Sequence, residues 1–469
     1  MRGIISAGGY VPYRRLQRAE IAKTFGSGGG KGTRSVASYD EDTTTMGVEA
    51  ARLALRSAPG GVTPDALWFA TAEPAYLDKN NASALHAALR LDSDVPAFDF
   101  GGALRSGVGA LRAALVSRGS VLVVASDLRT GLPTSGDEAA TGDGAAALLV
   151  GDDSDGAVIA EYLGAASTTE EFIERWRTPG STRSRQWEER FGEVKYGPLV
   201  DQAWNAALKA CELSADQVNR VVVTGMHARA VRGIAARLGT AKEALADDLA
   251  ATVGNTGTAH PALLLANVLE TAAPGEVVAL VVLADGADVL LFRTTDAIAK
   301  YAPARNIATQ IANGADLPYP KYLSWRGAVK TEPPRRPEPD RISASVSGRT
   351  EDWKYGFVGS RDRSSGELHL PPARVSRVGD AMDDMEAAPM ADVAGTIALI
   401  TVDRIAYSPS PPTVFAVVDW DGGGRLPVEL CDVDAASLKM GDRVEMTFRR
   451  LFTSDEIHNY FWKARPVRA

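Results

Sequence analysis

Residues 96–111 constrain the fold more than any other stretch, because they place a strand, a glycine turn and a helix in direct succession. The stretch opens with apolar residues and phenylalanines, passes through Gly101-Gly102, and continues as small residues with helical spacing. This pattern predicts a strand-to-helix elbow that carries residue 104. Enzymes place nucleophiles at such elbows, because the helix N-terminus lowers a thiol pKa and its free N–H groups bind anions. The residue at that position is leucine, Leu104.

A second run of similar elements follows later in the chain. Apolar residues 221–226 lead to His227, an Asn-x-Gly turn occupies residues 255–257, and a helix with two closing strands completes the run. The first run has the same order around Leu104. This duplication predicts an α/β domain of two similar halves that ends near residue 315.

The elbow and these later segments resemble the thiolase superfamily, particularly hydroxymethylglutaryl-CoA synthases and type III ketoacyl-ACP synthases. The resemblance covers nearly the whole chain and implies a five-layered thiolase fold. It also implies that cysteine stands at the elbow position that Leu104 occupies here. Three site residues follow from the resemblance: Glu73 as general acid/base, His227 as the group that polarises a thioester carbonyl or moves a proton, and Asn255 as the amide that helps to hold a thioester oxygen or a water.

Each of these residues also has a purely structural interpretation. Glu73 comes directly after an apolar strand, so it is either a site residue or a solvated loop carboxylate. A lone histidine such as His227 is usually a satisfied core or surface residue, and Asn255 suits a turn by itself. Ser106 is the only hydroxyl near Leu104, and it would need activation by a base.

The composition changes from Asp316 onward, where a Tyr/Trp/Arg cluster and the proline-rich run 333–339 predict a linker. Residues 359–379 then resemble the zinc ribbon of acyl-CoA-associated OB-fold proteins that partner thiolases. The positions that correspond to the metal ligands are Asp362, Ser365, Ser376 and Gly379. Because serine and glycine are poor zinc ligands and no thiolate remains among these positions, we predict no zinc.

Short alternating segments between about residues 395 and 464 predict a small antiparallel barrel, and their order resembles the OB fold. The predicted domains are therefore a thiolase-like domain (1–315), a linker with a degenerate zinc-ribbon-like segment (316–390) and an OB-fold domain (391–469).

Charge, cysteine content and hydropathy exclude several classes of function. A formal net charge of -8 argues against general nucleic-acid binding, which needs a positive surface. Cys211 and Cys431 are the only cysteines and lie in different predicted domains, so we expect no disulfide framework and a cytoplasmic location. The sequence contains no run of roughly 18 apolar residues that would cross a bilayer, and we expect no signal peptide.

The missing thiol decides which reactions stay open. Leucine forms no acyl-enzyme, so ping-pong Claisen or hydroxymethylglutaryl transfer through Leu104 is excluded. Glu73, His227 and Asn255 would still hold a thioester carbonyl and shuttle a proton, which favours aldol, retro-aldol or decarboxylative enolate chemistry. The expected substrate is a thioester of coenzyme A or of an acyl carrier protein, without a permanently bound cofactor.

Two other interpretations stay open at this point. One is a non-covalent or Ser106-dependent acyltransferase or condensing enzyme, and the other is a catalytically silent thiolase-fold scaffold. The resemblance to the superfamily also implies a homodimer.

Overall fold

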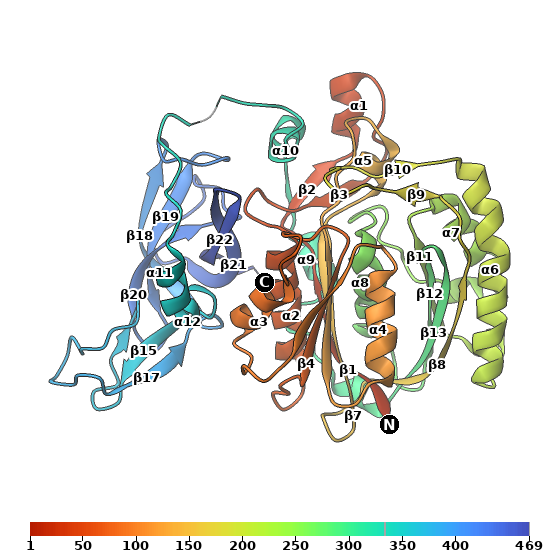
Figure 1. Cartoon of the computed structure of the whole chain (residues 1–469), viewed down its shortest axis with the longest axis horizontal. Coiled ribbons are helices and arrows are strands. Elements are labelled where there is room, and N and C mark those ends of the chain that lie inside the picture. The colour runs from red at the N-terminus through yellow and green to blue at the C-terminus, as the bar shows by residue number, and fades with distance from the viewer. Residues whose placement is uncertain (333, 469) are drawn as a thin grey trace.

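The computed structural model describes residues 1–332 and 334–468, and only the backbone at Glu189. Pro333, the first residue of the predicted proline-rich run, lies outside the described residues. An α/β domain formed by the first part of the chain lies beside a β-barrel formed by its C-terminal part (Figure 1). Within the described ranges, no helix is both long and apolar enough to cross a membrane.

One continuous sheet of nine strands organises the described part of the α/β domain. In the first half, β4 pairs in parallel with β5 and β6, and antiparallel β7 follows β6. In the second half, β11 pairs in parallel with β12, and antiparallel β13 follows β12. The halves join where β1 pairs with β8, so the predicted duplication is confirmed. The spatial order is β11 (Arg220–Gly225), β12 (Val277–Leu283), β13 (Gly286–Thr294), β8 (Ala160–Thr169), β1 (Arg2–Tyr10), β7 (Gly144–Asp152), β6 (Val121–Asp127), β4 (Ala66–Thr71) and β5 (Ala97–Gly101).

Helices divide this sheet into layers (Figure 1). α2 (Thr43–Ser57) and α3 (Ala82–Leu89) cover the outer face of the first half, and α6 (Glu189–Ala210) and α7 (Ala228–Ala235) cover the outer face of the second. α4 (Ser106–Val116) and α8 (His260–Leu269) lie between the halves and share one buried core with both. From one outer face to the other, the layers are outer helices, the first half of the sheet, the central helices, the second half of the sheet, and outer helices again. This order confirms the predicted five-layered architecture.

Shorter elements complete the α/β domain. β14 pairs with β2, and α10 packs against Leu16 and Ile21, so residues 315–325 pack with the first domain although they follow the boundary predicted at residue 315. These elements are β2 (Arg14–Gln17), α1 (Ala19–Phe25), β3 (Thr33–Val36), α5 (Gly136–Ala140), β9 (Arg175–Trp176), β10 (Arg185–Gln186), α9 (Ile307–Ala312), β14 (Ala315–Asp316) and α10 (Tyr319–Trp325).

The C-terminal part contains a small sheet and a closed barrel, which confirms the predicted β-barrel. Two short helices, α11 (Ala344–Arg349) and α12 (Glu351–Lys354), precede them. The small sheet consists of β16 (Leu368–His369), β15 (Val358–Asp362) and β17 (Met385–Pro389). The barrel consists of β18 (Gly395–Asp403), β19 (Thr413–Trp420), β20 (Arg425–Leu430), β22 (Ile457–Pro466) and β21 (Arg443–Ser454).

The zinc-ribbon-like segment is held by hydrogen bonds around Asp362. The carboxylate of Asp362 accepts hydrogen bonds from the hydroxyls of Ser364 and Ser365, at 2.8 and 2.6 Å. The Ser376 hydroxyl donates to the carbonyl oxygen of Val378 at 2.7 Å. No group of three or more His, Cys, Asp or Glu residues suited to a metal occurs among the residues described. That zinc does not bind here stays a prediction.

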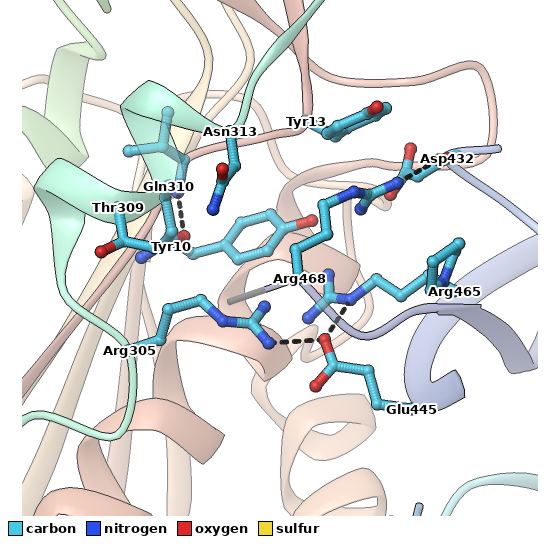
Figure 2. Close-up of a pocket in the computed structure, with 12 residues that line it drawn as sticks. Tyr10, Tyr13, Arg305, Thr309, Gln310, Asn313, Asp432, Glu445, Arg465 and Arg468 are labelled. Atoms are coloured by element: carbon cyan, nitrogen blue, oxygen red, sulfur yellow. Dashed lines mark hydrogen bonds and ion pairs between the residues drawn. The ribbon is translucent and has the colours of Figure 1, made fainter. Parts of the chain in front are cut away.

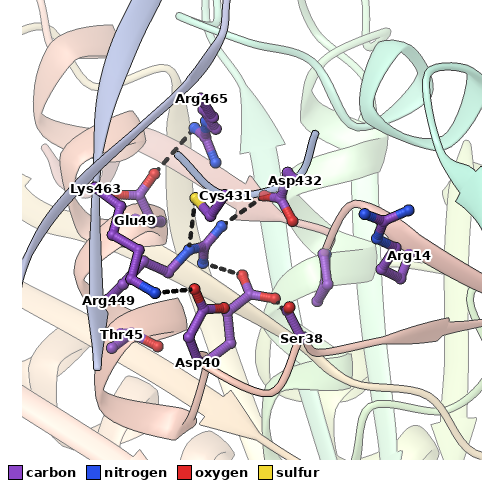
Figure 3. Close-up of polar contacts among 12 residues, drawn as sticks. Arg14, Ser38, Asp40, Thr45, Glu49, Cys431, Asp432, Arg449, Lys463 and Arg465 are labelled. Atoms are coloured by element: carbon purple, nitrogen blue, oxygen red, sulfur yellow. Dashed lines mark hydrogen bonds and ion pairs between the residues drawn. The ribbon is translucent and has the colours of Figure 1, made fainter. Parts of the chain in front are cut away.

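Buried ion pairs join the α/β domain to the barrel (Figure 3). Arg449 of β21 pairs with Glu41, next to the start of α2, and lies 2.7 Å from the carboxylate of Asp432. Lys463 of β22 lies 2.9 Å from the carboxylate of Asp40. All five side chains are buried, and a buried charge that loses its partner is costly. These pairs therefore hold the barrel against the N-terminal end of α2.

Candidate functional site

A cleft of about 1030 Å³ opens at the carboxyl ends of β4 and β5, beside the elbow that leads into α4. Ligands of α/β proteins commonly bind at this edge of a sheet, because the loops that follow parallel strands converge there. The wall is built mainly from the loop after β4, the elbow, residues 174–184, and the turn between β12 and β13. Titratable groups and the elbow leucine contribute to it, namely Glu73, Leu104, Arg129, Glu174 and Tyr196.

Leu104 lies in the turn between β5 and α4 and lines the cleft. Before it, Gly102 turns the chain with a φ of 92°, which favours glycine, and donates its N–H to the carbonyl oxygen of Thr71 at 3.2 Å. After it, the Nε of Arg105 donates to the carboxylate of Asp288 at 2.8 Å. The elbow is thus fixed on both sides, which determines where Leu104 meets the cleft.

Ser106 is engaged in the elbow itself. Its hydroxyl donates to the carbonyl oxygen of Gly101 at 3.1 Å and accepts from the N–H of Ala103 at 3.4 Å. Ser106 is not one of the described residues that line the cleft. Since an attacking serine needs a neighbouring base, this arrangement does not favour Ser106 as a nucleophile.

Glu73 lies two residues after the end of β4 and lines the cleft. Its carboxylate pairs with Arg177, which also donates to the carbonyl oxygen of Ala72. Burial raises the pKa of the Glu73 carboxyl, and Arg177 only partly opposes that rise. A carboxyl group with a raised pKa exchanges protons more readily near neutral pH, as an acid/base catalyst must.

Asp127, at the end of β6, ties the Glu73 loop to the Asn255 loop. One carboxylate oxygen accepts the N–H of Ala72 at 2.9 Å, and the other accepts the N–H of Thr258 at 2.8 Å. Loops from the two halves of the domain are therefore held together behind the cleft.

His227 ends the turn after β11 and caps α7. Its Nδ1 accepts the N–H of Ala230 at 3.1 Å, so the neutral ring carries its proton on Nε2. The ring is buried, lies 6.3 Å from the ring of Tyr196 between centroids, and packs against Gly192 of α6. Its neighbour Met226 lines the cleft, whereas His227 is not among the described lining residues.

Asn255 uses both ends of its amide to hold backbone groups. Its Nδ2 donates to the carbonyl oxygen of Gly225 at 3.0 Å, and its Oδ1 accepts the N–H of Gly257 at 2.9 Å. The side chain thereby joins its own turn to the end of β11, two residues before His227. The structure places Asn255, like His227, in a loop next to the cleft and outside its described lining.

Glu174 and Tyr196 form a buried pair in the cleft wall that the sequence did not reveal. The Tyr196 hydroxyl donates to Oε2 of Glu174 at 2.6 Å, while Oε1 of Glu174 is buried and has no hydrogen-bond partner among the described residues. Burial, followed by the nearby Glu174 charge, raises the pKa of Tyr196. Glu174 lies directly before β9 and Tyr196 lies in α6, so only the tertiary fold shows that they meet.

A second cavity, of about 40 Å³, lies between the α/β domain and the barrel (Figure 2). Glu445 of β21 lies between Arg305 and Arg465, with oxygen to nitrogen distances of 2.6 and 2.8 Å (Figure 2). Tyr10 and Arg468 also line this cavity. It is too small for an acyl thioester, and we regard it as part of the domain interface.

Comparisons with known proteins agree with this architecture. Residues 208–289 match the family model of the C-terminal part of 3-oxoacyl-[acyl-carrier-protein] synthase III, and residues 388–449 match that of the C-terminal OB-fold domain of ChsH2. The hydroxymethylglutaryl-CoA synthase of Pyrococcus furiosus is 30% identical over 284 residues, which cover 58% of this chain and 80% of that protein. The chain belongs to the hydroxymethylglutaryl-CoA synthase family. This membership places it among the enzymes of the thiolase superfamily.

Solved structures share the fold of this hydroxymethylglutaryl-CoA synthase family member. An HMG-CoA synthase complexed with CoA gives a TM-score of 0.56 at 18% identity, over 69% of this chain and 90% of that one. The HMG synthase of the curacin biosynthetic pathway, in complex with apo donor-ACP, gives a TM-score of 0.57 at 17% identity, over 70% of this chain and 89% of that one. These similarities confirm the predicted thiolase fold, and the ChsH2 match confirms that an OB-fold domain follows it.

Proposed function

We propose that this member of the hydroxymethylglutaryl-CoA synthase family makes or breaks a carbon–carbon bond next to the carbonyl of an acyl thioester, through an enolate and without a cysteine acyl-enzyme. One observation carries the proposal: Glu73 and Leu104 line the same cleft, and neither Cys211 nor Cys431 is among the described residues of its wall. The cleft therefore offers an acid/base group without a thiol.

Glu73 has the properties that enolate chemistry needs. In the bond-forming direction its carboxylate takes a proton from the carbon next to the thioester carbonyl, and the electron pair moves onto the carbonyl oxygen. In an aldol step the enolate carbon then attacks a second carbonyl, whose oxygen receives the proton that Glu73 took, so the carboxylate is regenerated. The N-terminus of α4, which begins just after Leu104, favours negative charge at the elbow.

The other two residues of the predicted trio take supporting roles in this proposal. His227 caps α7, and Asn255 joins the end of β11 to its own turn. We assign both to positioning the loops around the cleft, with Glu73 as the catalytic residue. The hydrogen bonds of Ser106 within the elbow weigh against the serine acyltransferase alternative.

We further propose that the thioester is carried by coenzyme A or by an acyl carrier protein, and that the chain acts as a homodimer without a permanently bound cofactor. The support for the thioester carrier comes from the two similar structures, one of which was solved with CoA and the other with a donor ACP. The homodimer and the absence of a cofactor are proposed from the resemblance to the superfamily.

The test combines intact-protein mass spectrometry with product analysis after incubation with acyl-, malonyl- and β-ketoacyl-CoA thioesters. We expect product without a covalent adduct, and a drop in turnover of about 10²- to 10⁴-fold in Glu73→Gln. Glu193→Gln, which removes an exposed carboxylate from α6, is the matched control and keeps full turnover. An adduct on Ser106 would support acyl transfer instead, and neither product nor adduct would favour the silent scaffold.

A further inference from the structure

We propose that Arg129 binds a carboxylate on the acyl group, so that the substrate is a monothioester of a dicarboxylic acid. This inference rests on the proposed function, and it names the class of thioester that the cleft accepts.

Arg129 is a buried cation in the cleft wall with few partners. It follows β6, lines the cleft, and is only 7% exposed. An arginine side chain has five N–H donors. Among the described residues, its guanidinium makes one hydrogen bond, from Nη2 to the Ser184 hydroxyl at 3.3 Å, and its Nε is buried without a partner.

The nearest carboxylate does not satisfy Arg129. Oδ2 of Asp127 lies 3.7 Å from Nη1, which is an ionic contact beyond hydrogen-bond distance. That oxygen already accepts the N–H of Thr258 at 2.8 Å, and the other oxygen accepts the N–H of Ala72 at 2.9 Å. Asp127 is thus committed to holding loops together, and most donors of Arg129 stay available.

The two other arginines in the described part of the wall differ in this respect. Arg175 donates from both terminal nitrogens to the two oxygens of Asp137, at 2.7 and 2.8 Å. Arg177 pairs with Glu73. Arg129 is therefore the cleft arginine whose charge is least compensated by hydrogen-bonded carboxylates, and burial lowers its pKa accordingly.

A carboxylate is the group that such a site would recognise. The guanidinium is planar and binds carboxylates through two parallel hydrogen bonds, which fix orientation as well as position. An acyl group that is never attached covalently needs another anchor to hold its reacting carbon in place. A carboxylate at the far end of the acyl chain, bound to Arg129, would provide that anchor.

The experiment measures binding to the full-length protein by isothermal titration calorimetry with two matched pairs of thioesters. Succinyl-CoA is compared with 4-methylpentanoyl-CoA, and malonyl-CoA with isovaleryl-CoA. Within each pair the acyl groups have the same number and connectivity of non-hydrogen atoms, and only one carries a carboxylate. Because the CoA part is shared, binding of its phosphates to Arg129 would affect both members equally.

We expect the carboxylate member of at least one pair to bind about 10- to 100-fold more tightly, as for a hydrogen bond to a charged group. Arg129→Met should abolish this preference and Arg129→Lys should restore part of it. Arg183→Met is the matched control, because Arg183 is exposed on the same loop as Ser184 and is not among the described lining residues. That variant should keep the preference.

Equal binding within both pairs by the unmodified protein would overturn the inference, even if Arg129→Met failed to fold. A preference that persists in Arg129→Met would overturn it as well. Product analysis of the same samples separates the two proposals. Turnover without a carboxylate preference would leave the proposed function standing, whereas a preference without carbon–carbon chemistry would leave only the carboxylate site. Absence of binding by all four thioesters would count against both.

Discussion

Tyr196 connects two residues of the candidate site. Its hydroxyl donates to Glu174, and its ring lies beside the ring of His227. Glu174 is buried and has one oxygen without a hydrogen-bond partner in the described structure, so the bond from Tyr196 is important for keeping this carboxylate in place.

Replacing Tyr196 by phenylalanine should therefore destabilise the protein. Tyr196→Phe leaves a buried carboxylate oxygen of Glu174 without its donor, which costs about 1–3 kcal/mol of unfolding free energy. Urea denaturation measures the change. Tyr162→Phe is the control, because Tyr162 is half-buried and its hydroxyl makes no hydrogen bond among the described residues. It should change stability by less than about 0.5 kcal/mol. Equal stability of Tyr196→Phe and the unmodified protein would contradict the importance of this bond.

At the residue scale, the sequence allowed us to predict a site residue at the end of a strand, but not residues that form part of the site only through tertiary contacts. Glu73 could be predicted because it directly follows an apolar strand, and the structure places it in the cleft. Arg129 also follows an apolar strand, but its lack of a hydrogen-bonded carboxylate depends on tertiary packing, and Glu174 and Tyr196 meet only through the tertiary fold. The predicted catalytic roles of Glu73, His227 and Asn255 stay predictions.

At the scale of single elements, the packing of α4 determines the position of the elbow. A Cβ atom at Gly107 would lie 2.5 Å from the carbonyl oxygen of Thr258, in the short turn Gly257–Ala259. Gly109, one half-turn further, faces open space. Gly107 therefore has no room for a side chain, whereas Gly109 has.

Gly107→Ala should cost about 1–3 kcal/mol of stability, because α4 must move away from Thr258. It should also lower turnover, since Leu104 and the elbow move with the helix. Gly109→Ala should instead stabilise the protein by about 0.5–1 kcal/mol, because alanine favours the helix. Thermal denaturation of both variants tests the pair, and similar effects of the two substitutions would contradict this account.

Glu270, at the end of α8, gives the stability a dependence on pH. Both carboxylate oxygens accept the N–H of Ile307 at the start of α9, at 3.1 and 2.9 Å, and burial raises the pKa of Glu270 from 4.5 to about 7. The folded protein therefore keeps a proton that the unfolded chain loses. The contribution of protonated Glu270 to the free energy of unfolding is complete below pH 4.5 and is lost as the pH rises to about 7.

Glu270→Gln should remove this loss of stability at higher pH. We expect the variant to match the unmodified protein near pH 4.5 and to exceed its stability by roughly 1–2 kcal/mol near pH 8, allowing for partial exposure. Urea denaturation across this pH range measures the difference. A constant difference at all pH values would show that Glu270 keeps its ordinary pKa in the folded protein.

The elements themselves could be predicted because their signals are local. Apolar runs around residues 121–127 and 221–226 indicated buried strands, and the elbow indicated α4. The packing of residues 315–325 onto the first domain could not be predicted in this way, since it depends on a pairing between β14 and β2, which are distant in sequence.

At the scale of the whole molecule, buried charges make the barrel and the α/β domain one unit. Arg449 is fully buried and pairs with Glu41 of one domain and Asp432 of the other. Neither carboxylate reaches solvent when the domains are joined. The domains therefore depend on each other for the stability of this cluster.

Arg449→Met should destabilise the protein by about 3–5 kcal/mol, because it leaves buried carboxylates without a cation. Calorimetry should then resolve separate unfolding transitions for the two domains where the unmodified protein shows one. Arg443→Met removes an exposed pair with Asp421 and should cost less than about 1 kcal/mol without dividing the transition. A single, unshifted transition in Arg449→Met would contradict this view of the interface.

The composition of the cleft wall also determines how the site responds to oxidants. Cys211 ends α6 and Cys431 is buried in the barrel, and neither is among the described lining residues. Peroxide and alkylating agents inactivate enzymes by modifying an exposed thiolate at the reacting centre. The chemistry proposed for this cleft therefore lacks the thiolate through which these reagents stop enzymes with an acyl-cysteine intermediate.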